Sequence, residues 1–151
     1  MADANVVAEQ MALALAQGGL QKATARVLAA FLFAEQDSVT AGDLGEQLGI
    51  SSGAVSGAIK MLGTVGLIER VPAPGSRREH YRLREGAWAT LMSAQNGMLQ
   101  AMFETADQGI QAVGEESTPG RRLAEMRDFY AYLMRELPAV IDRWKAERDL
   151  A

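Results

Sequence analysis

The hydrophobic positions of this chain recur mainly at the three- and four-residue spacing of helices. Val6, Met11 and Leu15 start this pattern, which stops at the Gly18-Gly19 pair. Apolar residues at this spacing form one face of a helix, and Gly is common just beyond a helix end. The pattern predicts helices over residues 5–17, from Leu20 to Ala34, from Thr40 to Gly49, from Ser51 to Thr64, and over most of residues 86–148.

Local signals mark the ends of the two central helices. Thr40 and Asp43 have the spacing of a capping box, and Val39 is placed for a hydrophobic staple. Gly49 ends the first of these helices, and Ser51-Ser52 can cap the next one. Two helices joined by a short turn that contains Gly form the outline of a helix-turn-helix.

Two short stretches after Gly66 alternate between apolar and polar residues. They cover residues 67–71 and 80–83, and the segment between them contains Pro74-Gly75 and Arg77-Arg78. Alternation at a spacing of two predicts strands, and Pro and Gly predict a turn. We therefore predict a two-stranded β-hairpin with a basic tip.

The C-terminal part of the chain is predicted to form long helices that pack on one another. Apolar residues continue at helical spacing from Trp88 to Val113, which predicts one helix of some seven turns. A second helix should start at Thr118-Pro119, with Thr118 as its cap. Pro138 should kink or divide this helix because proline removes a helical hydrogen bond.

Together these elements predict a mainly α (α+β) fold with a winged helix-turn-helix core and flanking helices. The predicted domains are an N-terminal helix at 1–19, a winged helix-turn-helix at 20–85 and a C-terminal helical region at 86–151, and the family resemblance described below implies that the two terminal regions form a dimer.

The composition excludes several kinds of site. The 151 residues include no Cys and one His, so a disulfide framework, a thiolate zinc site and a cysteine nucleophile are all excluded. The Glu115-Glu116 pair falls in a polar turn without the apolar surroundings that would raise a carboxyl pKa for acid–base catalysis. We therefore expect neither an enzyme nor a metal or organic cofactor.

Charge is distributed unevenly along the chain. Residues 1–50 carry two Lys/Arg and six Asp/Glu, residues 51–84 carry six and two, and residues 85–151 carry seven and eleven. The net charges are −4, +4 and −4, so the negative total hides a basic segment that can neutralise phosphates. This segment contains the second central helix and the hairpin.

The chain is expected to be cytoplasmic and to have no membrane partner. Its longest apolar runs, such as Val27 to Ala34, are far shorter than the roughly 20 residues that span a bilayer. The start, Met1-Ala2-Asp3, lacks the basic region of a signal peptide.

The basic segment offers two candidate surfaces for double-stranded DNA. Backbone N–H groups at the start of the second central helix can approach phosphate, and the outward face of this helix can enter the major groove. Arginines at a wing tip suit the negative potential of the adjacent minor groove. The predicted DNA-binding residues are Ser51, Ser52, Gly53, Ser56, Gly57 and Lys60 on the helix, and Arg77 and Arg78 on the wing.

The order and spacing of these motifs resemble those of the MarR superfamily of bacterial transcriptional regulators, and most closely its GbsR-type branch. The matching stretches are residues 43–51, 54–56, 66–71 and 74–81, with Trp88 shortly after them. The resemblance implies a homodimer, joined through its terminal helices, that binds a pseudo-palindromic operator and acts as a repressor. One departure is Gly57-Ala58, where the family often carries a large basic or polar side chain.

The resemblance also allows a small-molecule effector that releases the DNA. Candidate lining residues lie on the long helices beyond the hairpin, although Met and aromatic residues at helical spacing also suit a core or a dimer interface. They are Trp88, Met92, Met102 and Phe103.

Two alternatives remain open from the residues alone. A winged helix also serves as a protein-interaction module without specific DNA binding, and the fold by itself does not decide between these uses. His80 is interpreted as a structural or phosphate-facing residue rather than as a sensor of pH.

Overall fold

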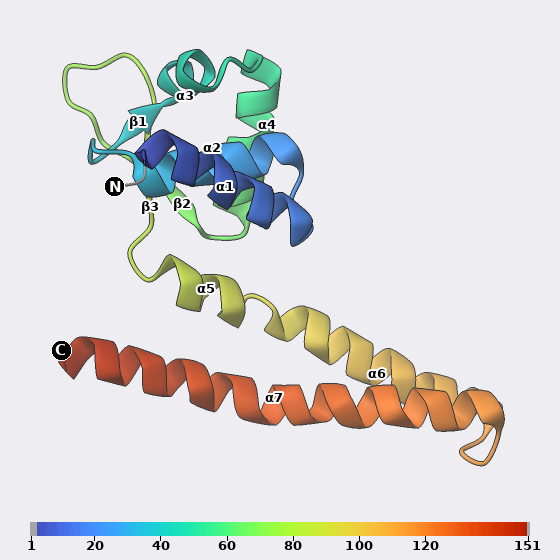
Figure 1. The fold of residues 1–151 in the computed structure, drawn as a ribbon. Coiled ribbons are helices and arrows are strands. Elements are labelled where there is room, and N and C mark those ends of the chain that lie inside the picture. Colours follow the sequence, from blue (N-terminus) through green and yellow to red (C-terminus); the bar gives the residue numbers. More distant parts are fainter. Residues whose placement is uncertain (1–2, 151) are drawn as a thin grey trace. The chain divides into compact units, whose positions relative to one another are not determined.

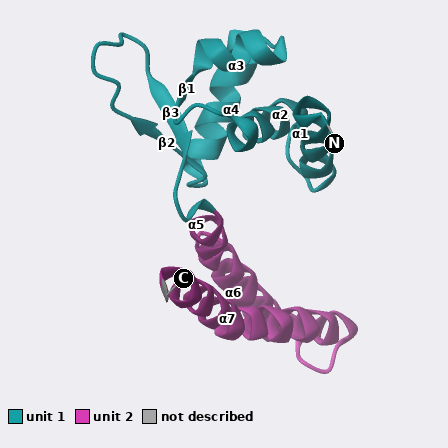
Figure 2. Cartoon of the chain, turned by 60° about the vertical axis from the view of Figure 1, so that its left-hand side comes forward, with its two compact units in different colours: residues 1–87 teal, residues 88–151 magenta. Residues whose placement is uncertain are grey.

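Seven helices and three short strands make up the described part of the chain, residues 3–150, in a computed structural model (Figure 1). They fall into two units, one ending at Ala87 and one starting at Trp88 (Figure 2). The first unit contains the predicted winged helix-turn-helix, and the second contains the predicted long helices.

The first unit is built around three helices, α2 (Lys22–Phe33), α3 (Ala41–Leu48) and α4 (Ser52–Thr64). Helix α1 (Ala4–Gln17) packs on α2. The largest fully buried side chains of the described residues come from these three central helices, and removing them from water stabilises the unit. They are Val27, Leu28, Leu44, Val55 and Leu62.

Most predicted helix ends of the first unit are confirmed. The Thr40 Oγ1 accepts a hydrogen bond from the Asp43 N–H, and the Asp43 carboxylate accepts one from the Thr40 N–H, both at 3.1 Å. Gly49 ends α3 in the left-handed region at φ 65°, which favours glycine. Helix α2 begins later than predicted because the Leu20 N–H still bonds to the Leu15 carbonyl at the end of α1.

The sheet has three strands rather than the predicted two. Strands β2 (Ile68–Val71) and β3 (His80–Leu83) form the expected antiparallel hairpin, and β1 (Val39–Thr40) pairs with the outer side of β3. Val39 lies in β1 at a buried position opposite Tyr81, and its part in a hydrophobic staple stays a prediction. A two-residue strand is too short to show alternation, and it pairs with residues about 40 positions away.

The second unit contains α5 (Ala87–Ser93, whose first residue belongs to the first unit), α6 (Asn96–Val113) and α7 (Thr118–Leu150). The prediction of one uninterrupted helix over residues 88–113 is wrong, because the chain makes a turn at Ala94 and Gln95. There the Gln95 N–H bonds to the Met92 carbonyl at 3.2 Å, three residues back instead of four. The weak helix formers Asn96 and Gly97 follow this turn.

In α7 the predicted cap is wrong, and of the two effects predicted for Pro138 division of the helix does not occur. Ser117, not Thr118, caps the helix, because its Oγ accepts a hydrogen bond from the Gly120 N–H at 3.0 Å. Pro138 lies inside α7 without dividing it. The helical period continues past the proline, and Ile141 in the next turn is buried.

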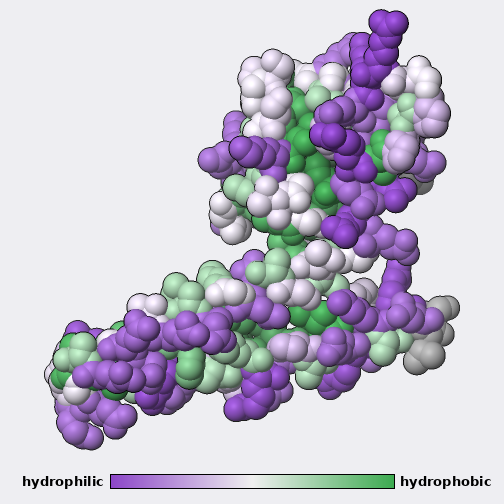
Figure 3. All heavy atoms as spheres, turned by 180° about the vertical axis from the view of Figure 1, so that it is seen from behind, coloured by the Kyte–Doolittle hydropathy of each residue, from purple (hydrophilic) through white to green (hydrophobic). Residues whose placement is uncertain are grey.

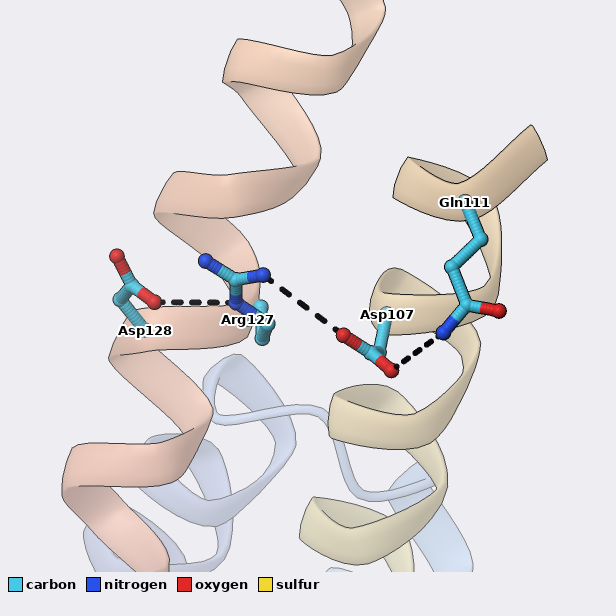
Figure 4. Close-up of polar contacts among 4 residues, drawn as sticks. All are labelled: Asp107, Gln111, Arg127 and Asp128. Atoms are coloured by element: carbon cyan, nitrogen blue, oxygen red, sulfur yellow. Dashed lines mark hydrogen bonds and ion pairs between the residues drawn. The ribbon is translucent and has the colours of Figure 1, made fainter. Parts of the chain in front are cut away.

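Helices α6 and α7 form a hairpin held by a close contact and by charge. A Cβ on Gly109 would lie 2.8 Å from the Leu123 Cδ1, so glycine allows the two helices to approach here. Nearby, Arg127 on α7 pairs with Asp107 on α6 at 3.7 Å and with Asp128 at 3.2 Å (Figure 4). The Gln111 side chain also donates a hydrogen bond to Asp107.

Candidate nucleic-acid interface

The start of α4 presents its backbone to solvent. Ser51, Ser52 and Gly53 are all exposed. The Ser51 Oγ accepts a hydrogen bond from the Ala54 N–H at 3.2 Å, so this hydroxyl caps the helix and keeps its own proton free to donate. The first N–H groups of a helix have no partner within the helix, and the helix dipole favours an anion beside them.

The outward face of α4 is formed by small side chains and one lysine. Ser56, Gly57 and Lys60 are exposed, on the side away from the buried Val55 and Leu62. A Cβ built on Gly57 meets no atom within 4 Å, and the same is true of Gly53. Packing within the described residues therefore does not require glycine at these two positions, and another molecule can approach the helix closely there.

The wing turn, residues 73–78, carries the two predicted arginines. The Ser76 N–H bonds to the Ala73 carbonyl at 3.0 Å, and Gly75 has φ 84°, so Pro74-Gly75 occupies the central positions of a tight turn. Arg77 and Arg78 follow this turn and are both exposed. The structure thus places both side chains at the tip of the hairpin.

Arg78 also approaches the start of α3, which the sequence did not predict. Its Nη1 lies 3.6 Å from the position that a Cβ would take on Gly42. The pKa of the Asp43 carboxyl is lowered, mainly by its hydrogen bonds from the Thr40 backbone and side chain and further by the charges of Arg78 and His80. The sequence does not reveal this contact, because Arg78 and Gly42 are far apart in the chain and only the fold of the wing brings them together.

The other arginines of the basic segment form salt bridges with Glu69 on β2 and with Glu79 just before β3. Arg70 pairs with Glu79 at 3.1 Å, and Arg82 pairs with Glu69 at 2.9 Å. Arg84 lies 3.9 Å from the same Glu69. Within residues 3–150, the salt bridges therefore leave Lys60, Arg77 and Arg78 as the unpaired cations of the segment from residue 51 to 84.

Tyr81 belongs to the same paired region of the hairpin. Its hydroxyl donates a hydrogen bond of 2.7 Å to Glu79. This bond raises the pKa of Tyr81, because ionisation would remove the donated proton beside a carboxylate. Strands β2 and β3 and the residues next to them thus form a network of paired charges, whereas Arg77 and Arg78 of the wing turn form no salt bridge among the described residues.

The predicted effector residues do not line a groove found within the first unit. This groove, of about 470 Å³, lies between α1, α2 and the end of α3, and Glu9 and Arg26 form an ion pair of 3.2 Å at its side. Trp88 and Met92 lie on α5 with exposed side chains, and Met102 and Phe103 are half-buried on α6. The effector pocket stays a prediction.

No group of three or more His, Cys, Asp or Glu side chains in residues 3–150 is placed to hold a metal ion. No helix in this part of the chain is long and apolar enough to span a membrane.

Two family models match the chain, one on each unit. A model described as "MarR family" matches residues 18–79, and a model described as "MmpR5-like MarR family transcriptional regulator" matches residues 86–147. The match to residues 18–79 contains the helix-turn-helix and most of the β-hairpin. The match to residues 86–147 contains almost all of the second unit, which is called the helical unit below.

Two transcriptional regulators match most of the length of this chain. The chain is 31% identical over 137 residues to the HTH-type transcriptional regulator MmpR5 of Mycobacterium tuberculosis (strain ATCC 25618 / H37Rv), over 90% of this chain and 83% of that protein. A crystal structure of a transcriptional regulator matches with a TM-score of 0.83 and 29% identity, over 96% of this chain and 99% of that chain. The predicted winged-helix fold and the predicted family are confirmed: the chain belongs to the MarR family of transcriptional regulators.

Proposed function

We propose that the chain binds specific DNA sequences as a homodimeric repressor of a pseudo-palindromic operator. The observation that carries this proposal is the exposed face of α4, where Gly53 and Gly57 have open space that packing does not explain, on the same unit as an unpaired basic wing turn. A helix with small outward residues can enter the major groove closely.

Each part of this surface has a separate task. Ser51, Ser52 and Gly53 offer backbone and hydroxyl donors to phosphate, and Ser56, Gly57 and Lys60 face the groove. Arg77 and Arg78 reach the neighbouring minor groove or its phosphates. With few long side chains on α4, specificity depends strongly on the wing and on DNA shape.

A homodimer is supported by apolar side chains that each unit leaves exposed. Figure 3 shows hydrophobic residues at the surface of the helical unit. Packing large exposed apolar side chains against a second copy would remove them from water, which favours association. In the helical unit they include Met98, Phe129, Tyr132, Val140 and Trp144, and on α1 they are Val6, Met11 and Leu13.

Two copies would present two α4 helices to one face of the duplex. In helix-turn-helix dimers these helices lie about 34–36 Å apart, which is one turn of DNA, and read half-sites of related sequence. We also propose that a small-molecule effector releases the protein from its operator DNA. The GbsR-type branch stays a prediction.

The first test is selection from a random pool of duplex DNA with the purified full chain at two salt concentrations. We expect enrichment of an inverted repeat whose half-sites are centred about ten base pairs apart. Weak binding without enrichment, lost as salt rises, would contradict the proposal and favour the protein-interaction module.

The wing assignment is tested by the salt dependence of binding to the selected site. Replacing both Arg77 and Arg78 by Ala should lower the slope of log K against log salt by roughly two units, because each lost phosphate contact contributes about 0.9. Arg121→Ala with Arg122→Ala is the matched control, since these adjacent exposed arginines lie on α7. An unchanged slope in the wing variant would remove the wing from the interface.

A further inference from the structure

The imidazole of His80 links two segments that are far apart in the sequence. Its Nδ1 lies 3.1 Å from the Ser38 Oγ, just before β1, and its Nε2 lies 3.1 Å from the Ser76 Oγ in the wing turn. A hydroxyl can both donate and accept, so both hydrogen bonds form whichever ring nitrogen carries the proton. His80 itself is on β3, opposite Thr40.

Ser76 is the point at which this link meets the wing. Its N–H closes the turn by bonding to the Ala73 carbonyl, and its Oγ accepts a hydrogen bond from the Arg78 N–H at 3.1 Å. The wing turn is therefore fixed internally by two bonds of one serine. The imidazole bonds to the same hydroxyl, so it attaches the whole turn to the sheet.

The other end of the link lies beside the helix-turn-helix. Ser38 precedes β1, and Thr40 at the end of β1 caps α3. The Arg78 guanidinium lies near Gly42 in the first turn of the same helix. The hydrogen bonds of His80 therefore join the basic turn to the segment that leads into α3.

We propose that His80 is a positioning residue, whose imidazole holds the wing turn, with Arg77 and Arg78, in one place relative to α3 before DNA binds. This inference rests on the proposed function, because the ordered turn matters for a surface that must fit a duplex. A turn that is ordered in the free protein loses less conformational entropy on binding. His80 then strengthens binding without touching DNA.

The experiment compares the full chain with His80→Leu and Ser38→Ala. In the absence of DNA, we expect ¹⁵N relaxation to show more motion at residues 75–78 and faster hydrogen exchange at the Arg78 amide in both variants. Binding to the selected duplex should weaken roughly three- to tenfold, as expected for one or two lost hydrogen bonds. The salt slope should stay unchanged, because no phosphate contact is removed.

Further variants separate positioning from a general structural role. His80→Gln keeps a donor and an acceptor and should recover part of the order and affinity. The double variant with both His80→Leu and Ser38→Ala should lose little more order and affinity than His80→Leu alone, because both changes break the same hydrogen-bonded link. Ser93→Ala, on α5, is the matched serine control and should change neither measurement. If His80→Leu does not fold, Ser38→Ala provides the comparison, because it removes a hydrogen bond of the imidazole and leaves the bond from the Arg78 N–H to the Ser76 Oγ intact.

Three results would overturn the inference. Unchanged relaxation at residues 75–78 would show that the imidazole does not order the turn. A salt slope lower by about one unit in His80→Leu would show that His80 itself contacts phosphate. Increased motion without any loss of affinity would show that order in the turn does not matter for binding. If the unaltered chain selects no DNA while the relaxation result holds, the proposed function fails and the ordering role of His80 stands.

Discussion

The two units of this chain differ in how completely each buries its own hydrophobic residues. The first unit encloses Leu28, Leu44 and Leu62 almost fully between its three central helices. The second unit buries residues such as Leu99 and Ile110, but it leaves several of its largest apolar side chains exposed. The first unit thus has a closed core, and the second has a helical hairpin with an uncovered apolar surface.

The two units therefore differ in what their apolar side chains do: some stabilise the fold of one chain, and others are free to contact a second copy. Burial of apolar area is the main favourable term both in folding and in association. We expect the core of the first unit to act within one chain, and the exposed side chains of the second unit to act between chains.

The largest effect is expected in the closed core. Leu62 is 1% exposed, and Leu62→Ala should lower the free energy of unfolding of the first unit by about 2–5 kcal/mol through lost burial and a cavity. Amide hydrogen exchange in α2 and α4 reports this change. Phe129→Ala, at a side chain that is 57% exposed, is the comparison and should leave that exchange unchanged. Equal losses in the two variants would refute the distinction between the units.

The exposed surface should control self-association. Phe129→Glu together with Trp144→Glu should weaken the dimer by at least about tenfold, because each change places a charge in an apolar contact. Sedimentation equilibrium measures the dissociation constant. Thr105→Glu adds a charge at an exposed polar position of α6 and is the control. Unchanged association in the double variant would move the interface to other side chains, such as those of α1.

A pH dependence is expected in the first unit at the capping box of α3. The pKa of Asp43 is lowered in the folded state from its ordinary value of 3.8, chiefly by the hydrogen bonds from Thr40. The carboxylate therefore contributes stability that is present above pH 3.8. This stability is lost as the pH falls through the lower pKa that Asp43 has in the folded state. Asp43→Asn should be less stable than the natural chain at neutral pH, and the difference should shrink below pH 4. A constant difference from pH 3 to pH 7, measured by urea unfolding, would contradict this assignment.

The smallest effect should have the opposite sign. Gly57→Ala should stabilise α4 by about 0.5–1 kcal/mol, because alanine favours a helix and the added Cβ meets open space. The same change should weaken binding to the selected DNA, because the methyl group lies on the face proposed to enter the groove. Gly63→Ala, near the other end of α4 and also in open space, should stabilise the helix without this loss. Equal binding by Gly57→Ala and the natural chain would contradict the close approach.

Local signals in the sequence were sufficient for the helix-turn-helix. Thr40, Asp43 and Gly49 set the ends of α3 by hydrogen bonds and backbone conformation within a few residues, so their pattern was readable directly. The exposed face of α4 followed from the helical period, because burying Val55 and Leu62 turns Ser56 and Lys60 outward.

Features that depend on distant pairing could not be predicted in this way. Strand β1 exists because Val39 meets Tyr81, and the neighbours of Arg78 and His80 depend on how the wing turn folds back toward α3. The break before α6 was missed because apolar spacing continues across Gln95 while the backbone does not continue the helix there.

The open space over Gly53 and Gly57 has an evolutionary consequence. Mutations that add side chains at these positions meet no atoms of the described chain, so they leave the core intact. The surface proposed to contact DNA can therefore change by single substitutions, while the buried Leu44, Val55 and Leu62 keep the scaffold in place. Related chains with this arrangement can acquire new target sequences without first acquiring a new fold.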